Sequence, residues 1–202
     1  MKEHLMKIVF VGDVVGKTAF IHRYVSGQFS LTTDATVGAA FREKTLQWSE
    51  KETVRLQIWD ISSRVRFDSM TMIFYKGALG CVVMFDVTNS SSFLRCQDWK
   101  RDLDSKATLP SGAPIPCILL ANMCDLPERV VTADSIAEFS KNNGFFTWME
   151  TSVRDNRNIG EAMRRLVQEI LSVQSSVDQP LSSQEDNVNL QSQDARRRQT
   201  CF

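Results

Sequence analysis

Apolar residues follow two patterns along the chain, and each pattern predicts one kind of strand. Continuous apolar runs predict strands buried on both faces, at 7–11, 81–86 and 117–122. Alternating apolar and polar residues at 40–48 and 53–60, joined by the polar sequence "SEKE", predict a hairpin of two half-exposed strands. The segment 145–150 predicts a last strand.

Helical periodicity fills the intervals between these strands. It predicts helices at 16–27, 91–107, 133–142 and 159–173. In the second of these, Phe93, Trp99 and Leu103 recur on one face. Such alternation predicts an α/β fold with a mostly parallel six-stranded sheet and helices on both faces. Ligands of these folds bind at the carboxyl ends of the strands.

The composition changes near Ser175, where Ser, Gln, Asp and Asn replace apolar residues. Such a segment buries too little apolar surface to offset the chain entropy lost on ordering. We therefore predict one folded domain over 1–174 and a disordered tail over 175–202.

Charge and cysteine content exclude several classes of protein. The 24 basic residues balance the 24 acidic ones, which argues against a nucleic-acid partner. The five cysteines form no C-x-x-C pair, which argues against zinc and a disulfide framework and favours a reducing cytoplasm. Neither a signal peptide nor a membrane-spanning apolar stretch is expected. We expect a cytoplasmic monomer.

A phosphate-binding pattern with one residue missing follows the first predicted strand. "GDVVGKT" at 12–18 nearly matches G-x-x-x-x-G-K-[ST], but three residues instead of four separate Gly12 from Gly16. One residue spans up to about 3.3–3.6 Å, so the loop must rearrange to hold a phosphate. One alternative is a slip of the strand by one position, which makes Val11 the first loop residue.

Further stretches at the strand ends complete a family pattern. "TVG", "LQIWDI", "RFDSMT", "FYKGA", "VMFDVTNSSSF", "ANMCDL" and "ETSVRDN" resemble the Rab-type members of the Ras-like small GTPases over about 5–173. "LQWSE" and "WKRDLDSK" are similar to the branch of trans-Golgi, endolysosomal and lysosome-related organelles. The resemblance implies the P-loop small-GTPase fold, GTP or GDP with Mg²⁺ as ligands, and partners that regulate or carry out vesicle traffic.

The resemblance also implies roles for individual residues. The nucleotide phosphates would lie against Gly12, Asp13, Val14, Val15, Gly16, Lys17, Thr18 and Ala19. Lys17 would reach the β- and γ-phosphates. Mg²⁺ would be held by Thr18, Thr36 and Asp60, with Thr36 joining only when a γ-phosphate is present.

Guanine would be recognised by a second group of residues, of which the motif "NMCD" supplies three. They are Asn122, Met123, Asp125, Ser152, Val153, Arg154 and Phe29. Asp125 would accept hydrogen bonds from the guanine N1–H and amino group, which distinguishes guanine from adenine. Met123 stands where the family has a lysine, so it can cover the base but cannot tie it to the phosphate loop. Phe29 would pack against the guanine, and the alternative is that it is an ordinary aromatic residue of the core.

Hydrolysis depends on a switch that departs from the family pattern. In "WDISSRVRF", Ser63 replaces a glycine whose N–H meets the γ-phosphate, and Arg64 replaces the glutamine that orients water. A guanidinium has donors and no acceptor, so Arg64 cannot take over that role. We therefore predict impaired GTP hydrolysis and name no catalytic residue.

Two further features of the sequence suggest contacts with partner proteins and with membranes. Phe41, Trp59 and either Phe74 or Tyr75 resemble the aromatic face on which Rab effectors pack, although ordinary hairpin packing is the alternative. In "RRRQTCF", Cys201 is a candidate lipidation site beside three arginines. If it is lipidated, the protein is expected on endomembranes of the Golgi or endolysosomal system as a peripheral protein.

Three functions remain open at this point. The first is a Rab-type GTP-binding protein with impaired hydrolysis. The second is a pseudo-GTPase scaffold that keeps the effector face and binds no nucleotide. The third, a P-loop phosphotransferase, is disfavoured because the N-x-x-D element and the "TVG" switch belong to the GTPase pattern.

Overall fold

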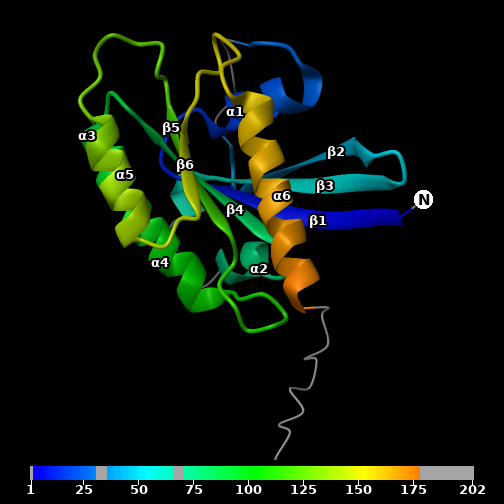
Figure 1. The fold of residues 1–202 in the computed structure, drawn as a ribbon. Helices are drawn as coiled ribbons and strands as arrows, with labels where there is room; N and C mark the ends of the chain where they lie inside the picture. Colours follow the sequence, from blue (N-terminus) through cyan, green and yellow to red (C-terminus); the bar gives the residue numbers. More distant parts are fainter. Residues whose placement is uncertain (1, 31–35, 66–70, 178–202) are drawn as a thin grey trace, which may run out of the picture.

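A computed structural model describes residues 2–30, 36–65 and 71–177, and it contains one six-stranded sheet in the order β2-β3-β1-β4-β5-β6 (Figure 1). The strands are β1 (Lys2–Val11), β2 (Ala39–Ser49), β3 (Glu52–Ile61), β4 (Gly80–Asp86), β5 (Cys117–Asn122) and β6 (Thr147–Glu150). β2 runs antiparallel to β3 and all other pairs are parallel. The predicted α/β class with a mostly parallel six-stranded sheet is confirmed.

Helices cover both faces of the sheet, as predicted. They are α1 (Lys17–Ser26), α2 (Thr71–Tyr75), α3 (Ser90–Leu94), α4 (Cys96–Lys106), α5 (Ala133–Asn142) and α6 (Ile159–Val177), with a 3₁₀ turn at η1 (Ser63–Val65). Figure 1 shows α1 and α6 together on one side and α3, α4 and α5 on the other.

Two apolar clusters, one on each face, hold the layers together. Along β1, Ile8 and Phe10 join the cluster under α1 and α6, whereas Val9 and Val11 join the cluster under the opposite helices. All four side chains are fully buried, and each such burial is worth about 1.5–3 kcal/mol. The continuous apolar run at 7–11 is therefore explained by a central strand with helices on both sides.

Several elements differ in extent from the prediction. β1 begins at Lys2 because its polar first residues pair with β3, and His4 lies 3.3 Å from Glu52. The predicted helix 91–107 is two helices separated by Arg95, and the five-residue α2 had no counterpart in the prediction. α6 extends to Val177, so the first residues of the predicted tail are helical. The remainder of that tail lies outside the described residues.

The parallel arrangement brings distant loops to one edge of the sheet. Gly12, Asp86 and Asn122 stand at the carboxyl ends of β1, β4 and β5, and Thr151 follows β6 directly. The motifs "GDVVGKT", "ANMCDL" and "ETSVRDN" lie in or next to these loops, so the fold assembles them at one end of the sheet. Among the described residues, no helix is long and apolar enough to cross a membrane.

Candidate functional site

The shortened loop begins at Gly12. Val11 is buried as the last residue of β1 and pairs with Val83, so the alternative in which Val11 becomes the first loop residue is wrong. Gly12 has φ +136°, and a Cβ there would lie 2.2 Å from the Met84 carbonyl oxygen. Only glycine tolerates this close approach. The loop therefore makes its turn with Asp13, Val14 and Val15 alone.

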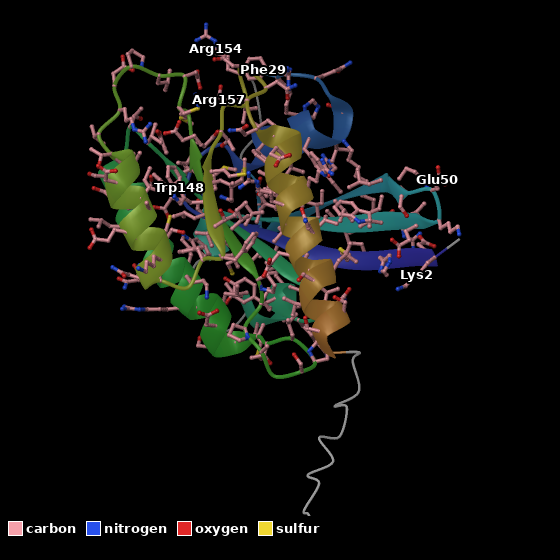
Figure 2. The ribbon with its side chains drawn as sticks, in the orientation of Figure 1. Lys2, Phe29, Glu50, Trp148, Arg154 and Arg157 are labelled. Atoms are coloured by element: carbon pink, nitrogen blue, oxygen red, sulfur yellow. The ribbon has the colours of Figure 1, made fainter. Side chains whose placement is uncertain are left out.

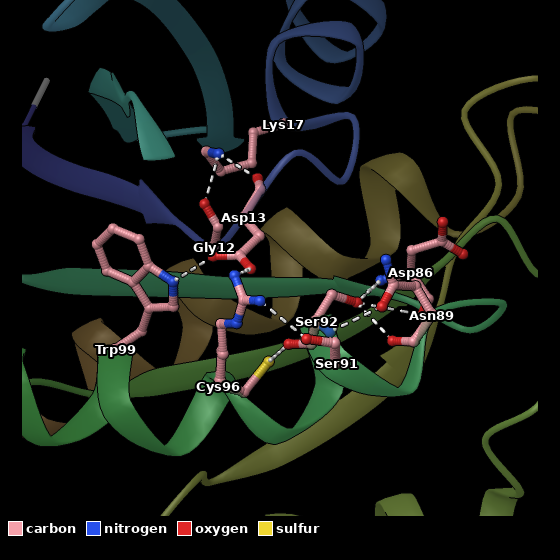
Figure 3. Close-up of polar contacts among 10 residues, drawn as sticks. Gly12, Asp13, Lys17, Asp86, Asn89, Ser91, Ser92, Cys96 and Trp99 are labelled. Carbon is pink, nitrogen blue, oxygen red and sulfur yellow. Dashed lines mark hydrogen bonds and ion pairs between the residues drawn. The ribbon is translucent and has the colours of Figure 1, made fainter. Parts of the chain in front are cut away.

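Lys17 lies at the base of this loop, as the motif predicts. Its Nζ donates hydrogen bonds of 2.8 Å to the carbonyl oxygens of Gly12 and Asp13 (Figure 3). Burial lowers the pKa of Lys17, while the carboxylates of Asp60 and Asp13 oppose that shift. A cavity of about 250 Å³ lies beside the ammonium group, lined by residues 13–18, Thr36, Ser62, Ser63 and Arg64.

Three oxygen-bearing side chains, which were predicted as metal ligands, lie close together at the N-terminus of α1. Thr18 Oγ1 donates to Asp60 Oδ2, and it lies 2.9 Å from Thr36 Oγ1. Thr36 Oγ1 is 3.3 Å from the same Asp60 oxygen. The other Asp60 oxygen is buried and has no hydrogen-bond partner within the described parts of the chain. Because oxygens are the ligands that Mg²⁺ prefers, these residues fit that ion.

The side chain of Asn122 joins three loops at the carboxyl edge. It is buried, its Nδ2 donates to the Val15 carbonyl oxygen at 2.9 Å, and its Oδ1 accepts from Thr151 Oγ1 at 3.1 Å. Sequence reasoning missed Thr151, although its position directly before Ser152 in the last motif was a signal. This bridge fixes the loop that carries Lys17 relative to the two loops that carry the predicted base-recognition residues.

The predicted base-recognition residues lie beyond Asn122, at the same end of the molecule. Met123 has φ +63°, and its Cε would be 3.8 Å from a Cβ built on Gly16, so its side chain reaches the phosphate loop. Asp125 is half-buried and hydrogen-bonds to no other residue that the structure describes. Both of its carboxylate oxygens are thus available to a ligand.

The last predicted motif supplies a rigid turn. Ser152 and Val153 are buried, and Ser152 Oγ accepts a hydrogen bond of 3.0 Å from the backbone N–H of Asp155. Arg154 is exposed, and Phe29 is 38% exposed (Figure 2 shows both at the α1 end of the molecule). The exposed ring of Phe29 does not suit the alternative of a core aromatic.

The switch residues after β3 form a short turn that is tied to the segment of Thr36. The Ser62 N–H donates to the Gly38 carbonyl oxygen at 2.9 Å, and Ser62 Oγ accepts from the Arg64 N–H at 3.3 Å. Arg64 is exposed and lines the cavity beside Lys17. The turn thus places a cation, and no acceptor side chain, where the family has glutamine.

Comparison with known proteins assigns the chain to a family. The model of the Ras family matches residues 7–172. This chain belongs to the Ras family.

Its relatives are of the Rab type. The Ras-related protein Rab-7L1 of Homo sapiens is 51% identical over 191 residues, which are 94% of either chain. Rab-32 of Mus musculus is 47% identical over 177 residues, which cover 87% of this chain and 79% of that relative. Rab-32A of Dictyostelium discoideum is 43% identical over 197 residues, which cover 95% and 90% respectively. The chain is therefore a Rab-type protein of the branch that contains Rab-7L1 and Rab-32.

The aromatic face of this Rab-type protein lies across β2, β3 and α2. The ring centroids of Phe41 and Trp59 are 5.2 Å apart, and those of Trp59 and Phe74 are 6.4 Å apart. Phe41 is 40% exposed. Tyr75 was a wrong assignment, because its ring is fully buried and its hydroxyl donates to Asp102 at 3.0 Å. Phe74, one residue earlier on α2, is therefore the third aromatic residue of the cluster with Phe41 and Trp59.

Replacing Asn122 by alanine is expected to lower the free energy of unfolding of this Rab-type protein by about 2–3 kcal/mol. The reason is that the Val15 carbonyl and the Thr151 hydroxyl both lose a buried hydrogen-bond partner. Urea denaturation followed by circular dichroism measures the change. The matched control is Asn89→Ala, which removes an exposed cap of α3 and should cost about 1 kcal/mol. An equal loss in the two variants would contradict the bridging role of Asn122.

Proposed function

We propose that this chain is a guanine-nucleotide-binding Rab protein that acts in membrane traffic and hydrolyses GTP poorly. The observation that carries the binding part is the meeting of Thr18, Thr36 and Asp60, with one buried Asp60 oxygen that has no hydrogen-bond partner among the described residues. An orphaned buried carboxylate oxygen costs free energy unless a cation or donor satisfies it. Membership of the Ras family, whose members generally bind GTP or GDP with Mg²⁺, supports the same proposal.

Different residues of the site would bind the phosphates, the metal ion and the base. Lys17 and the N–H groups at the start of α1 would attract the phosphates, since the helix N-terminus carries partial positive charge. A bound Mg²⁺ would neutralise phosphate charge from Thr18 and Asp60. Asp125 would accept from the donors on the guanine edge, and Met123 would cover the base without forming an ion pair.

Titration of nucleotide-stripped protein with GTP or GDP, each with Mg²⁺, is expected to give binding, and ATP is expected to give none. Asp125→Ala should weaken GTP binding by about 100-fold or more, because it removes the acceptor for two guanine donors. Isothermal titration calorimetry measures the affinities, and Asp134→Ala on the exposed face of α5 is the control. No binding of GTP or GDP by a folded chain would instead favour the nucleotide-free scaffold.

Impaired hydrolysis follows from the side chains available near the cavity. Arg64 lines the cavity, but its guanidinium accepts no hydrogen bond and cannot orient an attacking water as the family's glutamine does. Ser63 adds a side chain where the family has glycine, which narrows the range of backbone conformations of the switch. Binding and turnover are therefore separable in this protein.

Arg64→Gln is expected to raise the rate of GTP hydrolysis by about tenfold or more, because it restores an acceptor for the attacking water. Single-turnover release of phosphate from preloaded GTP measures the rate. Arg164→Gln, an exposed position on α6, serves as the control. A starting chain that already hydrolyses GTP as fast as the Arg64→Gln variant would disprove the proposed impairment.

Action in membrane traffic requires a surface for partners and a contact with a membrane. The cluster of Phe41, Trp59 and Phe74 would bind effectors and regulators by packing apolar partner side chains. Cys201, which lies outside the described residues, would carry a lipid, and the adjacent basic sequence would favour anionic Golgi or endolysosomal membranes.

Cys201→Ser is expected to move most of the membrane-bound protein into the supernatant, because the lipid chain would supply the main apolar contact with the bilayer. Sedimentation of membranes from cells that express the chain measures the bound fraction. Cys124→Ser, a thiol half-buried within the folded domain, is the control. An unchanged membrane fraction in Cys201→Ser would contradict lipidation at this residue.

A further inference from the structure

Asp13 of the shortened loop is held on two sides. Its carbonyl oxygen accepts from Lys17, as described above, whereas its carboxylate contacts the opposite helix (Figure 3). Arg95 Nη1 donates to Asp13 Oδ2 at 2.6 Å, and Trp99 Nε1 donates to Oδ1 at 3.4 Å. Both carboxylate oxygens therefore accept hydrogen bonds from the α4 side of the loop.

Arg95 is itself fixed by its position between two helices. It closes α3 and precedes α4, and its backbone conformation is helical, with φ −70° and ψ −12°. Its second terminal nitrogen donates to Ser91 Oγ at 2.9 Å. The guanidinium is thus held in place by both of its terminal nitrogens: Nη1 contacts Asp13 of the loop and Nη2 contacts Ser91.

The charge of Asp13 matters because this residue lines the cavity beside Lys17. A carboxylate at the edge of a phosphate site repels a phosphate, and the repulsion grows with the number of phosphate charges. The short loop leaves only three residues between its glycines, so Asp13 has little freedom to turn elsewhere. Arg95 and Arg64 line the adjoining hollow of about 500 Å³ and bring positive charge to the same place.

We propose that Arg95 is a positioning residue for phosphate binding: its guanidinium neutralises Asp13 and holds the carboxylate against α4, out of the phosphate cavity. This inference rests on the proposed nucleotide binding. Arg95 acts through Asp13 and makes no contact of its own with the cavity beside Lys17. The missing loop residue is thus accommodated by an ion pair between residues that are 82 positions apart.

A purely structural role predicts a different result. The ion pair is partly exposed, with side-chain exposures of 42% for Arg95 and 14% for Asp13, and exposed pairs contribute little to stability. If Arg95 acts by neutralising charge, its loss should weaken phosphate binding strongly, and removal of the Asp13 charge should reverse that loss. If Arg95 only supports the fold, removal of the second partner brings no recovery.

The test is a double-mutant cycle of Arg95→Ala and Asp13→Asn in the full chain. Calorimetric titrations with GTP, GDP and GMP, all with Mg²⁺, give the dissociation constants. Arg95→Ala is expected to weaken GTP binding by about tenfold or more, GDP binding by less and GMP binding least, following the number of phosphate charges. Arg95→Ala/Asp13→Asn is expected to bind GTP more tightly than Arg95→Ala alone. Arg101→Ala, which replaces an exposed arginine on α4, is the control.

Each other outcome has a definite meaning. Equal weakening for the three nucleotides, no recovery in the double variant, or no weakening at all would overturn the role of Arg95 while nucleotide binding by the unchanged chain stands. Absence of binding by the unchanged chain would overturn the proposed function and this inference together. Arg95→Gln, which removes the charge but keeps N–H donors, provides the same cycle if circular dichroism shows Arg95→Ala to be unfolded.

Discussion

The buried amide of Asn122 is the contact on which the shape of the site depends. Its two hydrogen bonds reach residues 107 and 29 positions away, so they fasten loops that local sequence cannot hold together. Because leaving these partners unsatisfied in a buried setting costs free energy, the two hydrogen bonds favour the observed arrangement of the loop after β1. Lys17, Met123 and Ser152 are placed by that arrangement, because each lies next to a loop that Asn122 joins.

The sequence predicted the elements in which the pattern of apolar residues is regular from end to end, and it failed where that pattern changes within an element. The hairpin of β2 and β3 and the bounds of α5 follow from simple periodicity and agree closely with the structure. The first part of β1 was missed because its first three residues are polar and because it pairs with β3 only. The five residues of α2 are too few for a helical period, and the same shortness led to the wrong placement of Tyr75 on the surface.

The sequence predicted which residues form the site, but it did not predict the conformation of the loop after β1. Thr18, Thr36 and Asp60 were grouped by resemblance, and the structure brings their oxygens together. The effect of the missing residue could not be decided from the sequence, because an apolar strand buried on both faces accepts two registers equally well. The approach of Gly12 to the Met84 carbonyl decides it. The pairing of Asp13 with Arg95 was also hidden, since charged residues far apart carry no periodic signal.

One buried oxygen of Asp60 has no partner among the residues that the structure describes, which would link a bound ligand to the lifetime of the protein in a cell. A folded chain that buries an unsatisfied carboxylate oxygen is less stable than the same chain with that oxygen satisfied. Whatever occupies the site adds its binding free energy to the stability of the fold, in proportion to the logarithm of its concentration. Cellular proteases act on the unfolded fraction. A ligand that completed this site would therefore slow degradation of the protein as the ligand concentration rose.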